Sequence, residues 1–179
     1  MNSSTITSLD PVQRAHRQAE VVAALGAALP AHAVLYTPED TTPYECDGLT
    51  AYRQHPLCVA LPETESQVQQ VLHICHRLGV PVVARGAGTG LSGGAMPHVD
   101  GVTLSMAKFN RIVSVDALTR TAVVQCGVRN LAISEAAAPL GLYYAPDPSS
   151  QIACTIGGNV AENSRSEERR VGKECRSRW

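Results

Sequence analysis

Residues 85–94, RGAGTGLSGG, constrain the fold more than any other part of this 179-residue chain. Five glycines, at 86, 88, 90, 93 and 94, fall within nine positions, and three of them give the spacing G-x-G-x-x-G. Glycine permits positive φ and lets another group approach the backbone closely. The stretch therefore predicts either a loop that cradles a ligand or an elaborate turn between strands, and the residues alone leave both open.

The neighbours of this glycine loop argue against a Rossmann dinucleotide site. Such a site places the loop between a strand and a helix, because the helix N-terminus binds the pyrophosphate. A strand is expected at 80–84, but Pro97 and Gly101 follow the glycines and exclude a helix of useful length. A Walker loop is excluded because the Gly-Lys-Ser/Thr it needs is missing. We expect consecutive backbone N–H groups to form an anion nest without a helix, with Arg85 adding charge.

The rest of the chain predicts an α/β part followed by a mostly β part. Asp10 before Pro11 is typical of a helix start, and this helix is expected to run to about residue 29. Thr64 and Gln67 form a capping-box pattern, and the helix that they begin ends at Gly79. Strands are expected at 33–37, 57–62, 80–84, 101–106, 111–116 and 121–126, a further helix at 129–138, and a second glycine-bearing loop at 146–159.

Composition excludes several classes of function. A net charge of −1 and 4% aromatic residues argue against a nucleic-acid partner. The six cysteines contain no C-x-x-C pair, so we expect no metal or iron–sulfur site and interpret them as reduced, mostly buried side chains. No secretory signal opens the chain and no apolar run could span a bilayer, which predicts a cytoplasmic protein.

The last fifteen residues, 165–179, differ from everything before them. They carry six of the fifteen Lys and Arg residues and the single Trp. A basic arm for nucleic acid or a solvated helix end would explain such a composition. However, RSEERRVGKECRSRW also matches, letter for letter, the in-frame translation of a short-read sequencing adapter. We therefore expect a non-native tail and a natural sequence that is readable to about Ser164.

Two segments, PVVARGAGTGLSGGAMP and YYAPDPSSQIACTIGGNVAEN, together resemble the FAD-binding domain of the vanillyl-alcohol-oxidase (PCMH) type. PYECDGLTAYR and GVRNLAIS extend the resemblance to the branch that holds the FAD-binding large subunits of bacterial glycolate oxidase. The resemblance implies an α+β fold with a truncated PCMH-type domain at 53–164. It would follow an N-terminal helix and lead-in segment at 1–52.

The resemblance also implies which residues hold FAD. The first glycine loop would wrap the pyrophosphate through its backbone amides, and the second would run beside the flavin end. Some family members tether FAD through a histidine of the first loop; this loop has none, so non-covalent FAD is expected. Asp147 has an alternative interpretation as an ordinary turn residue before Pro148. The implied cofactor-binding residues are Arg85, Gly86, Ala87, Gly88, Thr89, Gly90, Leu91, Ser92, Pro146, Asp147, Ser150, Thr155, Gly157, Gly158, Asn159, Ala161 and Asn163.

The activity implied by the resemblance is oxidation of glycolate, or a related D-2-hydroxy acid, to the 2-oxo acid by hydride transfer to FAD. Catalytic groups are expected in a C-terminal domain outside this sequence, so no catalytic residue is named. A second flavin subunit and an iron–sulfur subunit are the implied partners, and any attachment to the inner membrane would run through them. Alternatives are a dehydrogenase of D-lactate or D-2-hydroxyglutarate, a reductase of cell-wall-precursor synthesis, or an inactive nucleotide-binding fragment.

Overall fold

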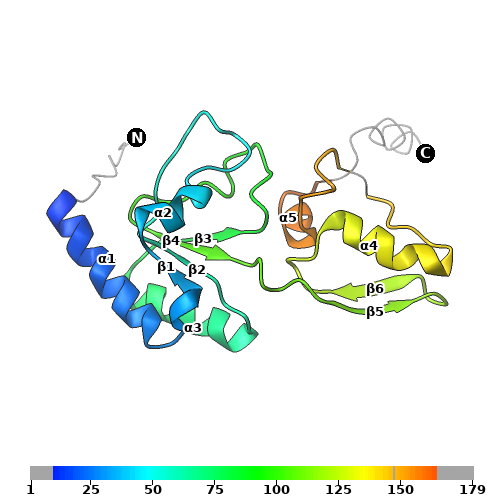
Figure 1. Cartoon of the computed structure of the whole chain (residues 1–179), viewed down its shortest axis with the longest axis horizontal. Coiled ribbons are helices and arrows are strands. Elements are labelled where there is room, and N and C mark those ends of the chain that lie inside the picture. The colour runs from blue at the N-terminus through cyan, green and yellow to red at the C-terminus, as the bar shows by residue number, and fades with distance from the viewer. Residues whose placement is uncertain (1–9, 147, 165–179) are drawn as a thin grey trace, which may run out of the picture.

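The computed structural model describes residues 10–146 and 148–164. These residues form two parts, which we call the sheet half (residues 10–106) and the hairpin half (residues 107–164). In Figure 1 the sheet half carries α1, α3 and strands β1 to β4, and the hairpin half carries β5, β6, α4 and α5. Asp147 and the predicted non-native tail lie outside the described residues, so the prediction for the tail stays a prediction.

The helices of the sheet half begin where the sequence predicts. α1 (Pro11–Gly26) is capped by Asp10, whose carboxylate accepts from the backbone N–H of Gln13 at 2.8 Å. α3 (Glu65–Leu78) is capped by Thr64 and ends at Gly79 in the left-handed conformation. The expected end of α1 near residue 29 is wrong, because the chain leaves the helix after Gly26 and a 3-10 turn (Ala31–Ala33) carries it to the sheet.

The sheet of this half has the order β1-β2-β4-β3. β2 (Cys58–Ala60), β4 (Val102–Ser105) and β3 (Val82–Arg85) run parallel, and β1 (Val34–Leu35) is an antiparallel edge. Because parallel strands end at the same edge of a sheet, β3 delivers the glycine loop to the edge where β2 and β4 also end. β1 belongs to segment 1–52, so that segment shares its sheet with residues 53–105, while the boundary at 52 stays a prediction.

One apolar core holds the sheet half together. α1 and α3 lie beside each other along one side of the sheet (Figure 1) and cover it with Val21, Leu25, Val71 and Cys75. Leu57, at the start of β2, is fully buried in the same cluster. This burial makes a stable platform, from which the glycine loop projects.

Segment 37–44, between β1 and β2, contains a short helical stretch. α2 (Pro38–Thr41) starts at Thr37, whose hydroxyl accepts from the N–H of Asp40, and a 3-10 turn (Thr42–Tyr44) continues it. Thr before Pro, followed by two acids, is a helix-start signal that was present in the sequence. Four residues after this turn, Gly48 bonds to Gly90 of the glycine loop.

The hairpin half follows the predicted order. β5 (Ile112–Asp116) pairs with β6 (Thr121–Val124), and α4 (Asn130–Ala137) lies along the hairpin (Figure 1). α4 continues into a 3-10 turn (Ala138–Leu140). The second glycine segment, expected as a loop, ends in a short helix, α5 (Ile156–Ala161). The mixed helix-and-sheet architecture confirms the predicted α+β class.

Candidate functional site

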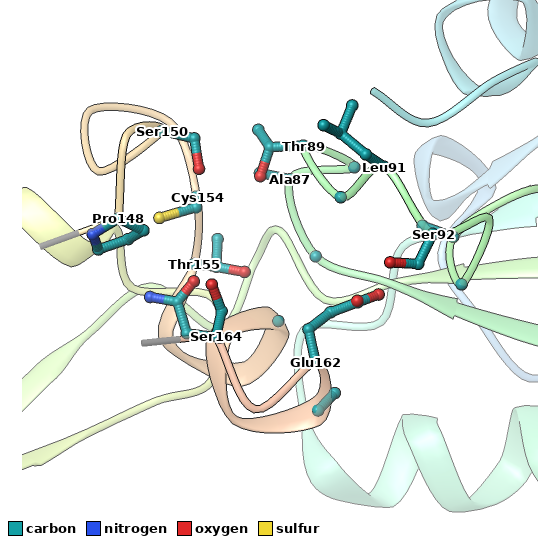
Figure 2. A pocket seen from close by; sticks show the side chains of 18 of the residues that line it. Ala87, Thr89, Leu91, Ser92, Pro148, Ser150, Cys154, Thr155, Glu162 and Ser164 are labelled. Atoms are coloured by element: carbon teal, nitrogen blue, oxygen red, sulfur yellow. The ribbon is translucent and has the colours of Figure 1, made fainter. Parts of the chain in front are cut away.

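A cleft of about 660 Å³ lies between the two glycine segments. Residues from segment 84–95 line its first wall, and residues from segment 148–164 line its second. Figure 2 shows Ala87, Thr89 and Leu91 on one side, facing Ser150, Cys154 and Thr155 on the other. The cleft thus joins two segments that are more than fifty residues apart in the sequence.

The first wall has the geometry that its glycines permit. Gly88 and Gly93 have φ angles of 71° and 79°, in the region that favours glycine. No helix occurs between Arg85 and Val102 among the described residues, which agrees with the exclusion of a Rossmann site. The polypeptide instead runs as an irregular loop, most of whose residues line the cleft.

The side chain of Arg85 supports this loop from the side away from the cleft. Its guanidinium donates to the carbonyl oxygens of Cys46 at 2.7 Å and Ala95 at 3.3 Å, and it lies 5.5 Å from the ring centroid of Tyr44. Burial lowers the pKa of this guanidinium. Any side chain at Gly88 would overlap it. Arg85 does not line the cleft, so its side chain positions the loop instead of lying at the surface of the site.

The lead-in segment packs against the same loop. The backbone N–H of Gly48 donates to the carbonyl of Gly90 at 2.9 Å. A Cβ at Gly48 would lie 2.7 Å from the carbonyl oxygen of Thr89, so the contact requires glycine there. Residues 44–48 are therefore the back support of the first wall, a role that the sequence did not reveal.

The second wall is set by the start of α5. Thr155 immediately precedes the helix, and Gly157 and Gly158 lie in its first turn. A Cβ at Gly157 would lie 2.8 Å from the Cβ of Cys126, so this glycine lets α5 approach the end of the hairpin. Gly157 faces that contact, whereas Gly158 lines the cleft. The two glycines were expected to face one ligand, but they lie on different surfaces.

Thr155 carries an unsatisfied polar atom where the two walls come close together. The residue is 7% exposed, and its Oγ1 has no hydrogen-bond partner among the described residues. A Cβ on Gly86 would overlap this oxygen, so the two walls meet at this pair. A buried hydroxyl without a partner costs free energy unless a ligand or water satisfies it.

An asparagine pair supports the second wall from within. Asn130, at the start of α4, is fully buried and donates its amide N–H to the carbonyl of Pro146 at 3.0 Å. Its Oδ1 accepts from the Nδ2 of Asn159 at 2.9 Å. Asn159 lines the cleft, whereas Asn130 lies behind it. The carbonyl of Pro146 is thus bonded to Asn130, and a cofactor contact of Pro146 stays a prediction.

Most of the predicted residues come together. Arg85, Pro146 and Gly157 do not line the cleft, and Asp147 lies outside the described residues. Those that line it are Gly86, Ala87, Gly88, Thr89, Gly90, Leu91, Ser92, Ser150, Thr155, Gly158, Asn159, Ala161 and Asn163.

Sequence reasoning missed several lining residues. They sit directly beside predicted ones, so contiguity with the two glycine segments was the signal that could have found them. Glu162, at the end of α5, extends toward the first wall in Figure 2 and is the one acidic side chain among the described lining residues. The others are Ala84, Gly94, Ala95, Pro148, Ser149, Cys154 and Ser164.

A second cleft of about 490 Å³ adjoins the first. The two clefts share Gly86, Ala87 and Thr155. Asn110, Val128 and Arg129 help to line the second cleft, which places a cation on its wall. An elongated ligand could therefore cross the Gly86–Thr155 contact with one part in each cleft.

Other kinds of site are not seen in residues 10–146 and 148–164. No group of three His, Cys, Asp or Glu side chains there could hold a metal ion. The five cysteines of that part are free. None of its helices is long and apolar enough to cross a membrane.

The chain is similar in sequence to a known family and to known proteins. Residues 56–175 match the profile of a family described as FAD binding domain. The chain is 61% identical over 144 residues to the glycolate oxidase subunit GlcD of Escherichia coli K12, covering 80% of this chain and 29% of that protein. It is 35% identical over 143 residues to D-2-hydroxyglutarate dehydrogenase of Xanthomonas citri pv. viticola, covering 80% of this chain and 30% of that protein.

Solved structures agree on the fold. Substrate-bound p-cresol methylhydroxylase superposes with a TM-score of 0.72 at 22% identity, over 81% of this chain and 29% of that one. The chain thus spans about three tenths of the length of the relatives that it matches.

Proposed function

Because this chain belongs to the FAD binding domain family, we propose that its two glycine segments hold FAD for the oxidation of a 2-hydroxy acid. The observation that carries the proposal is the Gly86–Thr155 contact. There the glycine loop and an unsatisfied buried hydroxyl face the same cleft. A ligand with both phosphate and hydrogen-bonding groups satisfies both walls at once.

The residues present fit FAD. Backbone N–H groups of 86–92 would face the diphosphate, as glycine loops do in other anion sites. Thr155, Ser150 and Asn159 would supply neutral hydrogen-bonding groups on the second wall. The first glycine loop contains no histidine, and we propose that FAD binds there without a covalent bond.

The proposed substrate is glycolate or a related D-2-hydroxy acid. The 61% identity to a glycolate oxidase subunit favours glycolate, and the matches to D-2-hydroxyglutarate and D-lactate dehydrogenases make those acids the alternatives. Bound FAD would supply a two-electron acceptor for the hydride from the substrate. The contribution of the present chain would be to bind and orient the cofactor, while the proton-transferring groups would come from a C-terminal region of the protein.

Partners follow from the same relative. Because that protein is named as a subunit, we propose that this one also works in a complex. A second flavin subunit and an iron–sulfur subunit are the partners proposed to carry electrons onward. A cytoplasmic location stays a prediction.

A spectroscopic experiment tests the proposal. The full-length protein is purified and its visible spectrum recorded, and acid precipitation should release the flavin into the supernatant as FAD. Anaerobic addition of glycolate should bleach the flavin band faster than equal D-lactate or D-2-hydroxyglutarate. A protein that never carries flavin would contradict the proposal. Faster bleaching by another hydroxy acid would correct only the substrate.

A further inference from the structure

A short chain of hydrogen bonds that begins away from the cleft determines whether the second wall offers a donor or an acceptor to a ligand. The carbonyl of Pro146 can only accept, so the side-chain group of Asn130 that faces it at 3.0 Å must be the NH₂. The oxygen of Asn130 must then face Asn159. Rotating the Asn130 amide by half a turn would set two carbonyl oxygens against each other.

The same reasoning fixes Asn159. Since Asn130 presents its Oδ1 at 2.9 Å, Asn159 must donate through its own NH₂. Its Oδ1 accepts no hydrogen bond from the described part of the chain, and the residue lines the cleft. Asn159 therefore offers an acceptor to whatever binds there, although an isolated asparagine could offer either group.

Burial makes this assignment strict. Asn130 is fully buried and Asn159 is 7% exposed, so water cannot readily replace either bond. A reversed amide would leave two buried groups unsatisfied, which is the costly case for polar groups in a protein interior.

We propose that Asn130 is a positioning residue that makes Asn159 a hydrogen-bond acceptor, and that this selects a ligand with a donor at that point of the cleft. The inference rests on the proposed binding of FAD. FAD has two sources of such a donor, the imide N–H of the flavin ring and the hydroxyl groups of the ribityl chain. Both groups are hydrogen-bond donors, which is what the Oδ1 of Asn159 requires.

Binding of FAD analogues tests the inference. The dissociation constants of FAD, of 3-methyl-FAD, which lacks the ring N–H, and of ribityl-deoxy FAD analogues are measured by fluorescence titration of the flavin-free full-length protein. We expect one class of analogue to bind about tenfold more weakly than FAD, because a lost donor leaves the Asn159 carbonyl unsatisfied. The class that loses affinity identifies the source. Equal binding of all analogues overturns the inference, whereas failure of FAD itself to bind contradicts the proposed function instead.

Variants of the protein distinguish a positioning role of Asn130 from a purely structural one. Asn130→Ala frees the Asn159 amide to rotate. The loss of affinity of the weaker analogue relative to FAD, which we call the penalty, should therefore shrink to within about twofold. Asn130→Asp, protonated in this buried place, can still donate to Pro146 and accept from Asn159, and should restore the penalty. Ile133→Ala, one turn along α4, removes packing without touching the amides and should lower stability while leaving the penalty unchanged.

The outcomes decide the role of Asn130. A penalty in Asn130→Ala equal to that in the unaltered protein overturns the positioning role. If Asn130→Ala does not fold, the comparison of Asn130→Asp with Ile133→Ala replaces it, and loss of the penalty in Asn130→Asp alone counts against the role.

Discussion

The sheet half and the hairpin half each supply one wall of the cleft, but they are held together differently. All the buried residues of the main apolar cluster belong to the sheet half, from Val21 to Leu104. The hairpin half buries fewer apolar side chains, among them Val128 and Ile133, and exposes Val113 and Val123 on its strands. The glycine loop thus projects from a self-supporting core, whereas the opposite wall depends more on polar contacts and close backbone packing.

The largest expected effect comes from the core of the sheet half. Leu57→Ala should lower the free energy of unfolding by about 2–5 kcal/mol, because it empties a fully buried position. Ile133→Ala in the hairpin half should cost less, because fewer apolar groups surround it. Urea unfolding of both variants measures the difference, and an equal or larger loss for Ile133→Ala would break the comparison.

The contact between the halves should respond to a single methyl group. Gly86→Ala places a Cβ against Thr155 Oγ1 and forces the walls apart, so FAD affinity should fall by about 1–3 kcal/mol. Gly26→Ala is the matched control: nothing lies within 4 Å of its Cβ, and it should leave affinity unchanged. Titration with FAD measures both, and unchanged affinity in Gly86→Ala would show that the walls can separate freely.

Alkaline pH should weaken the sheet half in particular. Burial raises the pKa of Cys58 to about 12 and that of Cys75 to about 11, against 9.0 for a free thiol. Because the folded values are raised, the stabilisation is complete below pH 9 and is lost as the pH rises toward 11 to 12. Between pH 8 and 10 the loss should be about 1 kcal/mol per thiol.

Unfolding at both pH values, with and without Cys75→Ala, tests this. The variant should show a smaller pH-dependent loss, whereas Ile133→Ala in the hairpin half, which removes no titratable group, should leave it unaltered. The same loss in all three proteins would mean that other groups cause it.

The smallest effect is expected on the surface of the hairpin half. Leu118 is 93% exposed in the turn between β5 and β6. Leu118→Ser should change the unfolding free energy by no more than about 0.5 kcal/mol, since it removes no packing. A larger loss in thermal or urea unfolding would reveal a contact that covers this turn and would reduce the contrast between the halves.

Local signals in the sequence predicted much of this arrangement. Asp10 and Thr64 predicted the starts of α1 and α3, because capping is a short-range interaction. Pro97 correctly excluded a helix after the glycine loop. The sequence could not show that Gly157 would pack on Cys126, which turns a glycine pair with poor helix propensity into the first turn of α5.

Long-range partners account for the remaining differences. Arg85 was expected to add charge at the loop, yet its hydrogen bonds go to Cys46 and Ala95, and the first of these is thirty-nine residues away. Asn130 carried no pattern at all, since only the fold brings it to Asn159 and Pro146. Residues whose roles depend on such distant contacts cannot be found by spacing.

The two sheets also differ in how their edges are protected. β1 closes one edge of the four-stranded sheet with only two residues, which offers little to an incoming strand. Among the described residues β5 and β6 pair only with each other, so each has an outer row of backbone groups free to bond, beside the exposed side chains of Val113 and Val123. Such a ribbon is a template for association between copies, and the isolated chain should be handled dilute and with its aggregation monitored.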